Sequence, residues 1–86
     1  MYQIFYEKKI FKDLDKIPAY DVKKIKEVFQ DLSKNPFPSG TKKISGKDNL
    51  YRVQQGDYRI LYSPNTKEKQ IHILLVKNRK GSYKNL

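Results

Sequence analysis

The chain has 86 residues, a hydrophobic share of 37% and a formal net charge of +10, so it has room for one hydrophobic core and we expect a single domain over residues 1–86. It contains no cysteine, which excludes a disulfide scaffold and a thiolate metal site. Its longest mainly apolar run, residues 71–76, is far shorter than the roughly 20 residues of a membrane span, and residues 1–8 lack the pattern of a signal peptide, so we expect a cytoplasmic protein with no membrane partner.

The first part of the chain predicts a strand followed by two helices. Residues 2–6 are aromatic and β-prone, which is typical of a short strand. Pro18 ends one helical pattern and fits the first turn of the next, which should run to about Lys34, before the Pro- and Gly-containing loop 35–40. The apolar stripes of the two helices are formed by Ile10, Phe11, Leu14 and Ile17, and by Val22, Ile25, Val28, Phe29 and Leu32.

The second half of the chain changes its apolar period from 3.6 to 2, which predicts strands. Residues 50–54 and 58–62 alternate on either side of a Gly-Asp pair at 56–57, a typical tight turn. After a second turn at 63–66, residues 70–76 are apolar on both faces, so we expect a central, covered strand. Short turns require antiparallel neighbours. The predicted fold class is therefore α+β: an N-terminal strand, a two-helix hairpin and an antiparallel three-stranded meander, whose sheet the first strand is free to join.

Positive charge is concentrated in the second half. Residues 1–40 carry eight lysines and six acids, a net +2, whereas residues 41–86 carry eleven basic residues and three acids, a net +8. A polyanion is the natural partner of such a half-molecule, and a solubilising lysine-rich surface is the alternative. The only arginines, Arg52, Arg59 and Arg79, lie in or just after the predicted meander. Because a guanidinium offers a planar fork of donors, they are candidates for phosphate recognition, with ordinary sheet-surface packing as the alternative.

Hairpin geometry brings two of these arginines together. If the pair at 56–57 forms a two-residue turn, Gln54 pairs with Arg59 and Arg52 pairs with Leu61. Arg52, Gln54 and Arg59 then share one face of the sheet, and the two arginines are diagonal neighbours. Two like charges this close repel each other unless an anion lies between them. A turn one residue longer would move Arg59 to the opposite face, so the prediction depends on the turn type.

Other chemistry-bearing residues are sparse. The single histidine, His72, lies in the middle of the last predicted strand, and we expect it to be structural. No pair of histidines offers a metal site, and no glycine-rich loop precedes a helix. We therefore expect neither a metal nor a cofactor.

The segment 49–62, Asn-Leu-Tyr-Arg-Val-Gln-Gln-Gly-Asp-Tyr-Arg-Ile-Leu-Tyr, resembles the central hairpin of the RelE/ParE toxin superfamily. The order of elements over residues 2–83 is also similar to that family. The ending, with Arg79 followed four residues later by Tyr83, resembles the RelE type in its archaeal-looking version, whereas ParE-type relatives generally lack that tyrosine. The resemblance implies the toxin of a type II toxin–antitoxin system: a ribosome-dependent mRNA endonuclease that cuts the A-site codon and is controlled by a RelB-like antitoxin.

The resemblance also implies roles for individual residues. In this chemistry the adjacent 2′-OH attacks the phosphate without a metal, and cations stabilise the developing charge. Arg59 would hold the scissile phosphate, Arg79 would stabilise the transition state and serve as the acid, and Tyr83 would stack on or orient a base of the codon. A guanidinium holds its proton tightly, so the acid role is costly. The residues expected to bind RNA phosphates are Arg52, Gln54, Lys77 and Lys80.

At Gln54 the sequence departs from the best-known bacterial pattern, where a lysine is the proposed general base, because an amide cannot take up a proton at neutral pH. The candidates for the base are then Tyr83 with a lowered pKa, a nearby lysine such as Lys80, or a group of the ribosome. Two further functions stay open at this point: a ParE-like inhibitor of DNA gyrase, and an inactive relative that only binds RNA or the ribosome.

Overall fold

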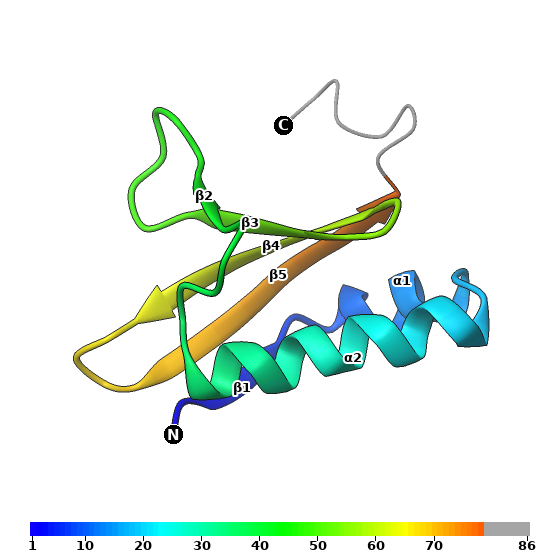
Figure 1. The fold of residues 1–86 in the computed structure, drawn as a ribbon, viewed down its shortest axis with the longest axis horizontal. Helices are drawn as coiled ribbons and strands as arrows, with labels where there is room; N and C mark the ends of the chain where they lie inside the picture. The colour runs from blue at the N-terminus through cyan, green and yellow to red at the C-terminus, as the bar shows by residue number, and fades with distance from the viewer. Residues whose placement is uncertain (79–86) are drawn as a thin grey trace.

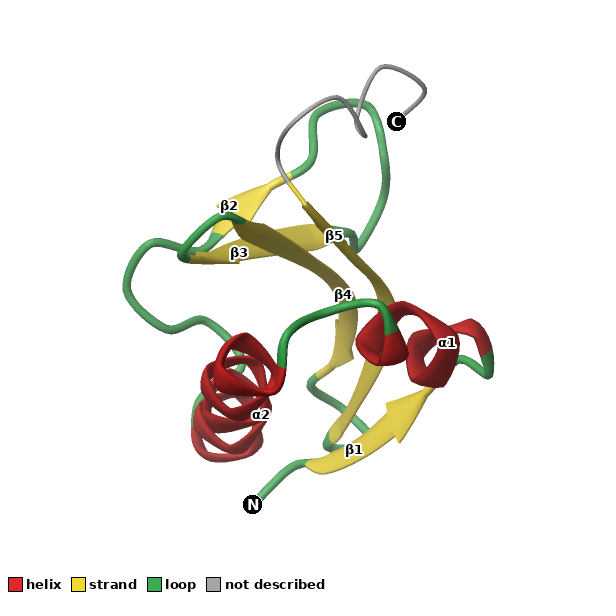
Figure 2. Cartoon of the chain, turned by 90° about the vertical axis from the view of Figure 1, so that its right-hand side faces the viewer, coloured by secondary structure: helices red, strands yellow, loops and turns green. Residues whose placement is uncertain are grey.

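The structure, a computed structural model, describes residues 1–78 and shows one five-stranded sheet with both helices on the same side (Figures 1 and 2). The strand order is β1-β5-β4-β3-β2. This confirms the α+β class. The elements are β1 (Gln3–Tyr6), α1 (Lys9–Asp15), α2 (Ala19–Lys34), β2 (Lys42–Lys43), β3 (Tyr51–Gln55), β4 (Tyr58–Asn65) and β5 (Gln70–Asn78).

Helix α2 follows its predicted apolar stripe, whereas in α1 only Ile10 is buried and Phe11 remains exposed, and both helices differ slightly from the prediction at their ends. Helix α1 ends at Asp15, and a tight turn follows in which the Ile17 N–H donates to the Leu14 carbonyl at 3.1 Å. Pro18 lies at the N-cap of α2 rather than inside its first turn, and its carbonyl accepts from the Asp21 and Val22 N–H groups. Neither helix of residues 1–78 is long and apolar enough to cross a membrane.

Strand β5 occupies the predicted inner position, since it pairs in parallel with β1 and antiparallel with β4. Strand β4, however, continues to Asn65, so the expectation of a turn at 63–66 was wrong. Pro64 fits this strand because the pairing of β4 with β3 stops at Tyr62, which lies opposite Tyr51, the first residue of β3. Beyond that point no residue of β3 requires the N–H that proline lacks. The side chain of Asn49 lies beside Pro64 instead and donates from Nδ2 to the Pro64 carbonyl at 2.6 Å.

The two-residue strand β2 is absent from the sequence prediction. Its residues pair with the start of β3, so that Lys42 lies opposite Arg52 and Lys43 opposite Tyr51. Two lysines carry no apolar alternation, which is the pattern that predicts strands. The sheet therefore has two more strands than the predicted meander: β1 at one edge and β2 at the other.

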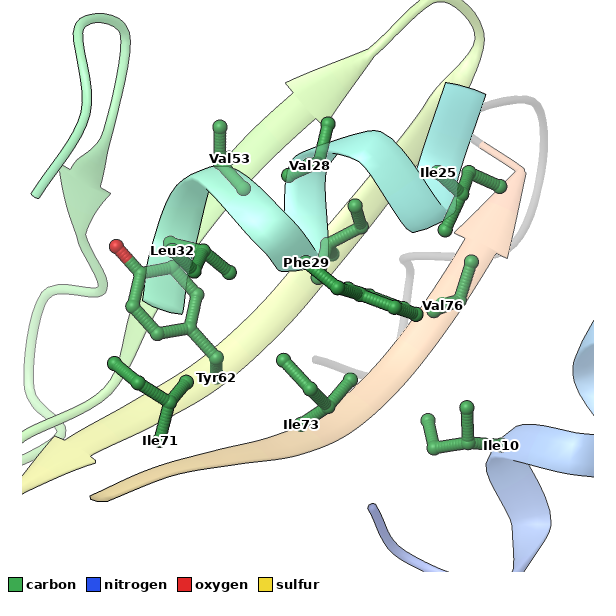
Figure 3. Packing of buried hydrophobic residues seen from close by; sticks show 11 residues of the cluster. Ile10, Ile25, Val28, Phe29, Leu32, Val53, Tyr62, Ile71, Ile73 and Val76 are labelled. Atoms are coloured by element: carbon green, nitrogen blue, oxygen red, sulfur yellow. The ribbon is translucent and has the colours of Figure 1, made fainter. Parts of the chain in front are cut away.

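The core lies between the helices and one face of the sheet (Figure 3). A bulge in β5 decides which residues reach it: the register passes from Leu61 opposite Leu75 to Tyr62 opposite Ile73, which leaves Leu74 as the extra residue. Ile71, Ile73 and Val76 consequently all face the helices. The buried cluster consists of Ile10, Ile25, Val28, Phe29, Leu32, Val53, Ile60, Tyr62, Ile71, Ile73 and Val76.

Truncating Ile73 tests this packing. Its side chain is fully buried in the inner strand, so we expect Ile73→Ala to lower the free energy of unfolding by about 2–5 kcal/mol, through lost transfer free energy and a residual cavity. Urea unfolding followed by circular dichroism measures the change. Lys67→Ala, in the exposed turn after β4, is the control and should change it by less than about 0.5 kcal/mol. A loss at position 73 no larger than in this control would contradict the assigned core.

Candidate functional site

The hairpin between β3 and β4 has the predicted two-residue turn. Gly56 has a φ of +60°, and Asp57 is not among the residues with positive φ, a pattern that fits a type II′ turn. The observed register places Gln54 opposite Arg59 and Arg52 opposite Leu61, which confirms the predicted pairing. The turn thereby decides which side chains of the hairpin face away from the helices.

The polar side chains of the hairpin gather on the face of the sheet opposite to the helices. Val53, Ile60 and Val76 point into the core, and side chains alternate along each strand, so their neighbours point the other way. Gln54, Arg59 and Lys77 form one row across β3, β4 and β5, while Lys42 and Arg52 belong to the next row. We call these five residues the basic face.

The two arginines of the basic face border a hollow of about 190 Å³. Arg52 and Arg59 are diagonal neighbours across the hairpin, with Cα atoms about 7–8 Å apart in such a register. A phosphate between them would relieve their mutual repulsion and accept from both planar forks. The hollow is lined by Gly40, Lys42, Arg52, Val53, Gln54 and Arg59.

An apolar strip lies beside the hollow. Leu61, only 5% exposed, is the register partner of both Arg52 and Leu75. It lies on the basic face, outside the core cluster that packs against the helices. Apolar neighbours reduce the local dielectric, so an anion held by the guanidinium groups would be bound more strongly here than on an open lysine surface.

The amide of Gln54 supports the turn. Its Nε2 donates to the Gly56 carbonyl at 2.9 Å, and the side chain is otherwise exposed. This contact gives Gln54 a role in holding the hairpin register. Its side chain contributes hydrogen-bonding groups to the hollow and no titratable one.

A second surface, on the helix side, is apolar. A groove of about 550 Å³ runs between β1, α1 and α2. Phe11 is 59% exposed at its rim, and the Tyr6 ring lies between the rings of Phe11 and Phe29, at centroid distances of 6.1 and 5.4 Å. Partial burial raises the pKa of the Tyr6 hydroxyl, which keeps it neutral. The main apolar lining residues are Ile4, Tyr6, Phe11, Leu14, Val22 and Phe29.

Comparison with known protein families identifies the fold and its class of function. The family described as "ParE toxin of type II toxin-antitoxin system, parDE" matches residues 4–83. The chain belongs to the RelE/ParE toxin superfamily. A protein of Methanocaldococcus jannaschii named RelE1 is 33% identical over 98% of this chain and 97% of its own length. A second protein of that organism, toxin RelE3, is 34% identical over 67% of this chain and 70% of its own.

Solved structures of RelE proteins share the fold. The archaeal RelE–RelB complex from Pyrococcus horikoshii contains a chain that is 32% identical, with a TM-score of 0.83 over 94% of this chain and 98% of the other. The isolated E. coli RelE toxin gives a TM-score of 0.80 over 96% of this chain and 89% of the other. Its 15% identity makes that likeness one of fold alone. The predicted family membership is thus confirmed.

The candidate residues of this toxin fold divide into three groups. Arg52, Gln54 and Arg59 lie together on the basic face, as the hairpin geometry predicts, and the register of β4 and β5 adds Lys77 to them. Arg79, Lys80 and Tyr83 lie outside the described residues 1–78. Sequence reasoning missed Lys42, because its two-residue strand shows no alternation of apolar and polar residues.

His72 lies away from the basic face. It stacks on Phe5 at a centroid distance of 5.1 Å and an interplanar angle of 17°. It lies five positions before Lys77 in β5, which corresponds to about 16 Å along a strand. This packing agrees with the structural role expected for the histidine.

Proposed function

We propose that this toxin is a ribosome-dependent mRNA endonuclease that cleaves the codon in the A site and so inhibits translation. The observation that carries the proposal is that two arginines, Arg52 and Arg59, line one hollow on the face of the sheet opposite to the helices. The family membership and the RelE relatives support the class of activity. The ending, in which Arg79 is followed four residues later by Tyr83, resembles the RelE type and favours it within the superfamily.

Arg59 is the residue best placed to hold the scissile phosphate. It lies in the middle of one row of the basic face, between Gln54 and Lys77. Its guanidinium can donate two parallel hydrogen bonds to phosphate oxygens, which fixes both the position and the orientation of the reacting group. Arg52, one row away, would bind the same phosphate or the next one along the strand.

Cleavage would proceed by attack of the 2′-OH on the adjacent phosphorus, with loss of the 5′-oxygen of the following nucleotide. Arg59 and Arg79 would stabilise the charge that develops on the phosphate oxygens, a contribution that is often the largest in such reactions. Arg79 would also protonate the leaving oxygen, and Tyr83 would orient a base of the codon. Since Gln54 cannot accept the 2′-OH proton, we assign that step to Tyr83 as its phenolate, to Lys80 as its uncharged amine, or to a group of the ribosome.

A second candidate function is inhibition of DNA gyrase, because the family that matches residues 4–83 is described as ParE toxin. Such an activity depends on binding and needs no transition-state cations. Arg79 and Tyr83 would then be dispensable for inhibition. A gyrase supercoiling assay with the purified protein separates this candidate from an endonuclease.

The partner that controls the toxin would be a RelB-like antitoxin. RelE chains from Pyrococcus horikoshii and Methanococcus jannaschii were crystallised as complexes with RelB. We propose that an amphipathic helix of the antitoxin occupies the apolar groove between α1 and α2, where Phe11 and Tyr6 offer exposed rings. Addition of a strand to the exposed edge of β1 is the alternative contact.

The first prediction concerns cleavage. Primer extension on an mRNA in programmed ribosomes should show cuts at the A-site codon only when both ribosomes and protein are present. We expect Arg59→Ala to lower the single-turnover cleavage rate at least about a hundredfold, because it removes a donor pair aimed at the developing charge. Arg59→Lys, which keeps the charge and loses the planar fork, should recover part of the rate.

The control for this experiment is Lys67→Ala, far from the basic face, which should cleave like the wild type. Unchanged cleavage by Arg59→Ala would refute the assigned role of Arg59. Absence of ribosome-dependent cuts by the wild type, together with inhibition of gyrase, would replace the endonuclease with the second candidate.

The second prediction concerns the antitoxin. We expect Phe11→Asp to weaken binding of the cognate antitoxin at least about tenfold, because it places a charge where an apolar anchor would be buried. Isothermal titration calorimetry measures the affinity. Tyr20→Asp is the matched control, since Tyr20 is 69% exposed on α2 and does not line the groove. Equal effects of the two substitutions would argue against this groove as the docking site.

A further inference from the structure

Two local hydrogen bonds stabilise the loop between α2 and β2. The Phe37 N–H donates to Asn35 Oδ1 at 2.9 Å, and the Thr41 N–H donates to the Pro38 carbonyl at 3.1 Å. Gly40, with a φ of +88°, supplies the left-handed residue of this last turn. The loop thus leads from the helix side of the sheet to its edge, where Lys42 begins β2 (Figure 1).

Tyr62, a core residue, forms a hydrogen bond with this loop. Its ring is fully buried beside Leu32 at one end of the cluster, and its hydroxyl points away from the other side chains (Figure 3). The hydroxyl donates to the Pro36 carbonyl at 2.6 Å and lies 3.4 Å from Thr41 Oγ1. Burial raises the pKa of this hydroxyl, partly offset by the Thr41 contact, so the group stays protonated and able to donate.

Lys42 follows the loop between α2 and β2 directly and lines the hollow of the basic face. It lies opposite Arg52 in the register, with Cβ atoms about 5 Å apart in such a pair, and it lines the hollow with Arg59. Lys43, the next residue, lies opposite Tyr51, so its side chain points to the other side of the strand. Its neighbour on that side, Tyr51, packs against Phe37 of the loop at 5.1 Å.

We propose that Lys42 binds a phosphate of the RNA strand beside the one held by Arg59, and that Tyr62 is a positioning residue for Lys42. The inference rests on the proposed function and adds to it a third cation and the tether that places it. Lys42, Arg52 and Arg59 place three cations around one hollow, and a single-stranded RNA offers successive phosphates that several cations can bind at once. The hydroxyl of Tyr62 acts through the loop and does not touch the RNA.

Binding of a labelled 12-nucleotide single-stranded RNA to the full chain, measured by fluorescence anisotropy from 50 to 300 mM KCl, tests the proposal. Lys42→Ala should weaken binding roughly tenfold at the lowest salt and reduce the slope of log affinity against log salt by about 0.7, the value for one phosphate contact on a single strand. Lys43→Ala, which removes the same charge one residue away, is the matched control and should leave the slope unchanged.

A double-mutant comparison tests the role of Tyr62. Tyr62→Phe keeps the ring and removes the hydroxyl, so it should weaken RNA binding about three- to tenfold. If Tyr62 acts through Lys42, the variant that carries both Tyr62→Phe and Lys42→Ala should bind RNA no more weakly than Lys42→Ala alone. If Tyr62→Phe acts by a general loss of stability, it should instead weaken RNA binding by the same factor in the wild type and in the Lys42→Ala variant. Circular dichroism at the assay temperature verifies that each variant is folded.

Each outcome decides the proposal. Equal slopes for Lys42→Ala and Lys43→Ala, with RNA cleavage by the wild type intact, would overturn the role of Lys42 and leave the proposed function standing. Independent, multiplicative effects of the Tyr62 and Lys42 substitutions would overturn the tether alone. If the wild type shows neither RNA binding nor ribosome-dependent cleavage, both the proposed function and this inference are overturned.

Discussion

The turn at Gly56 is the constraint on which both faces of this sheet depend. Its positive φ closes the β3–β4 hairpin in two residues and sets Gln54 opposite Arg59. The same register sends Val53 and Ile60 to the helices and Arg52 and Arg59 to the opposite face. A slip of one residue would exchange the two sets, burying charge and exposing the core. The hydrogen bond from Gln54 to the Gly56 carbonyl adds support to this turn.

The two faces of the sheet separate two kinds of contact. The basic face is built from β2, β3, β4 and the end of β5, the half of the sequence that carries a net +8. The apolar groove is built from β1, α1 and α2, where charges of both signs nearly balance. Under the proposed function, RNA would occupy the first and the antitoxin helix the second. An antitoxin in the groove would reach the basic face only through segments that continue around the sheet.

The parts that sequence reasoning predicted are those governed by local periodicity and turn chemistry. The stripe of α2, the inner position of β5 and the register of the hairpin follow from spacing and from a Gly-Asp pair. The parts it missed depend on partners distant in sequence. Pro64 is tolerated in β4 because β3 does not pair with β4 beyond Tyr62. Lys42 belongs to a strand only because it pairs with Arg52. The tether from Tyr62 to Pro36 joins residues 26 positions apart and has no local pattern.

Under the proposed function, the face of the sheet that carries Arg52 and Arg59 meets the mRNA, and the helix face does not. A cryo-electron microscopy structure of the Arg79→Ala variant on a programmed ribosome, with an intact A-site codon, would test this orientation. We expect a phosphate of that codon within hydrogen-bonding distance of Arg59, with the helices turned away from the mRNA. Contacts between the mRNA and the groove of α1 and α2, or a codon that passes Arg59 without touching it, would refute this orientation.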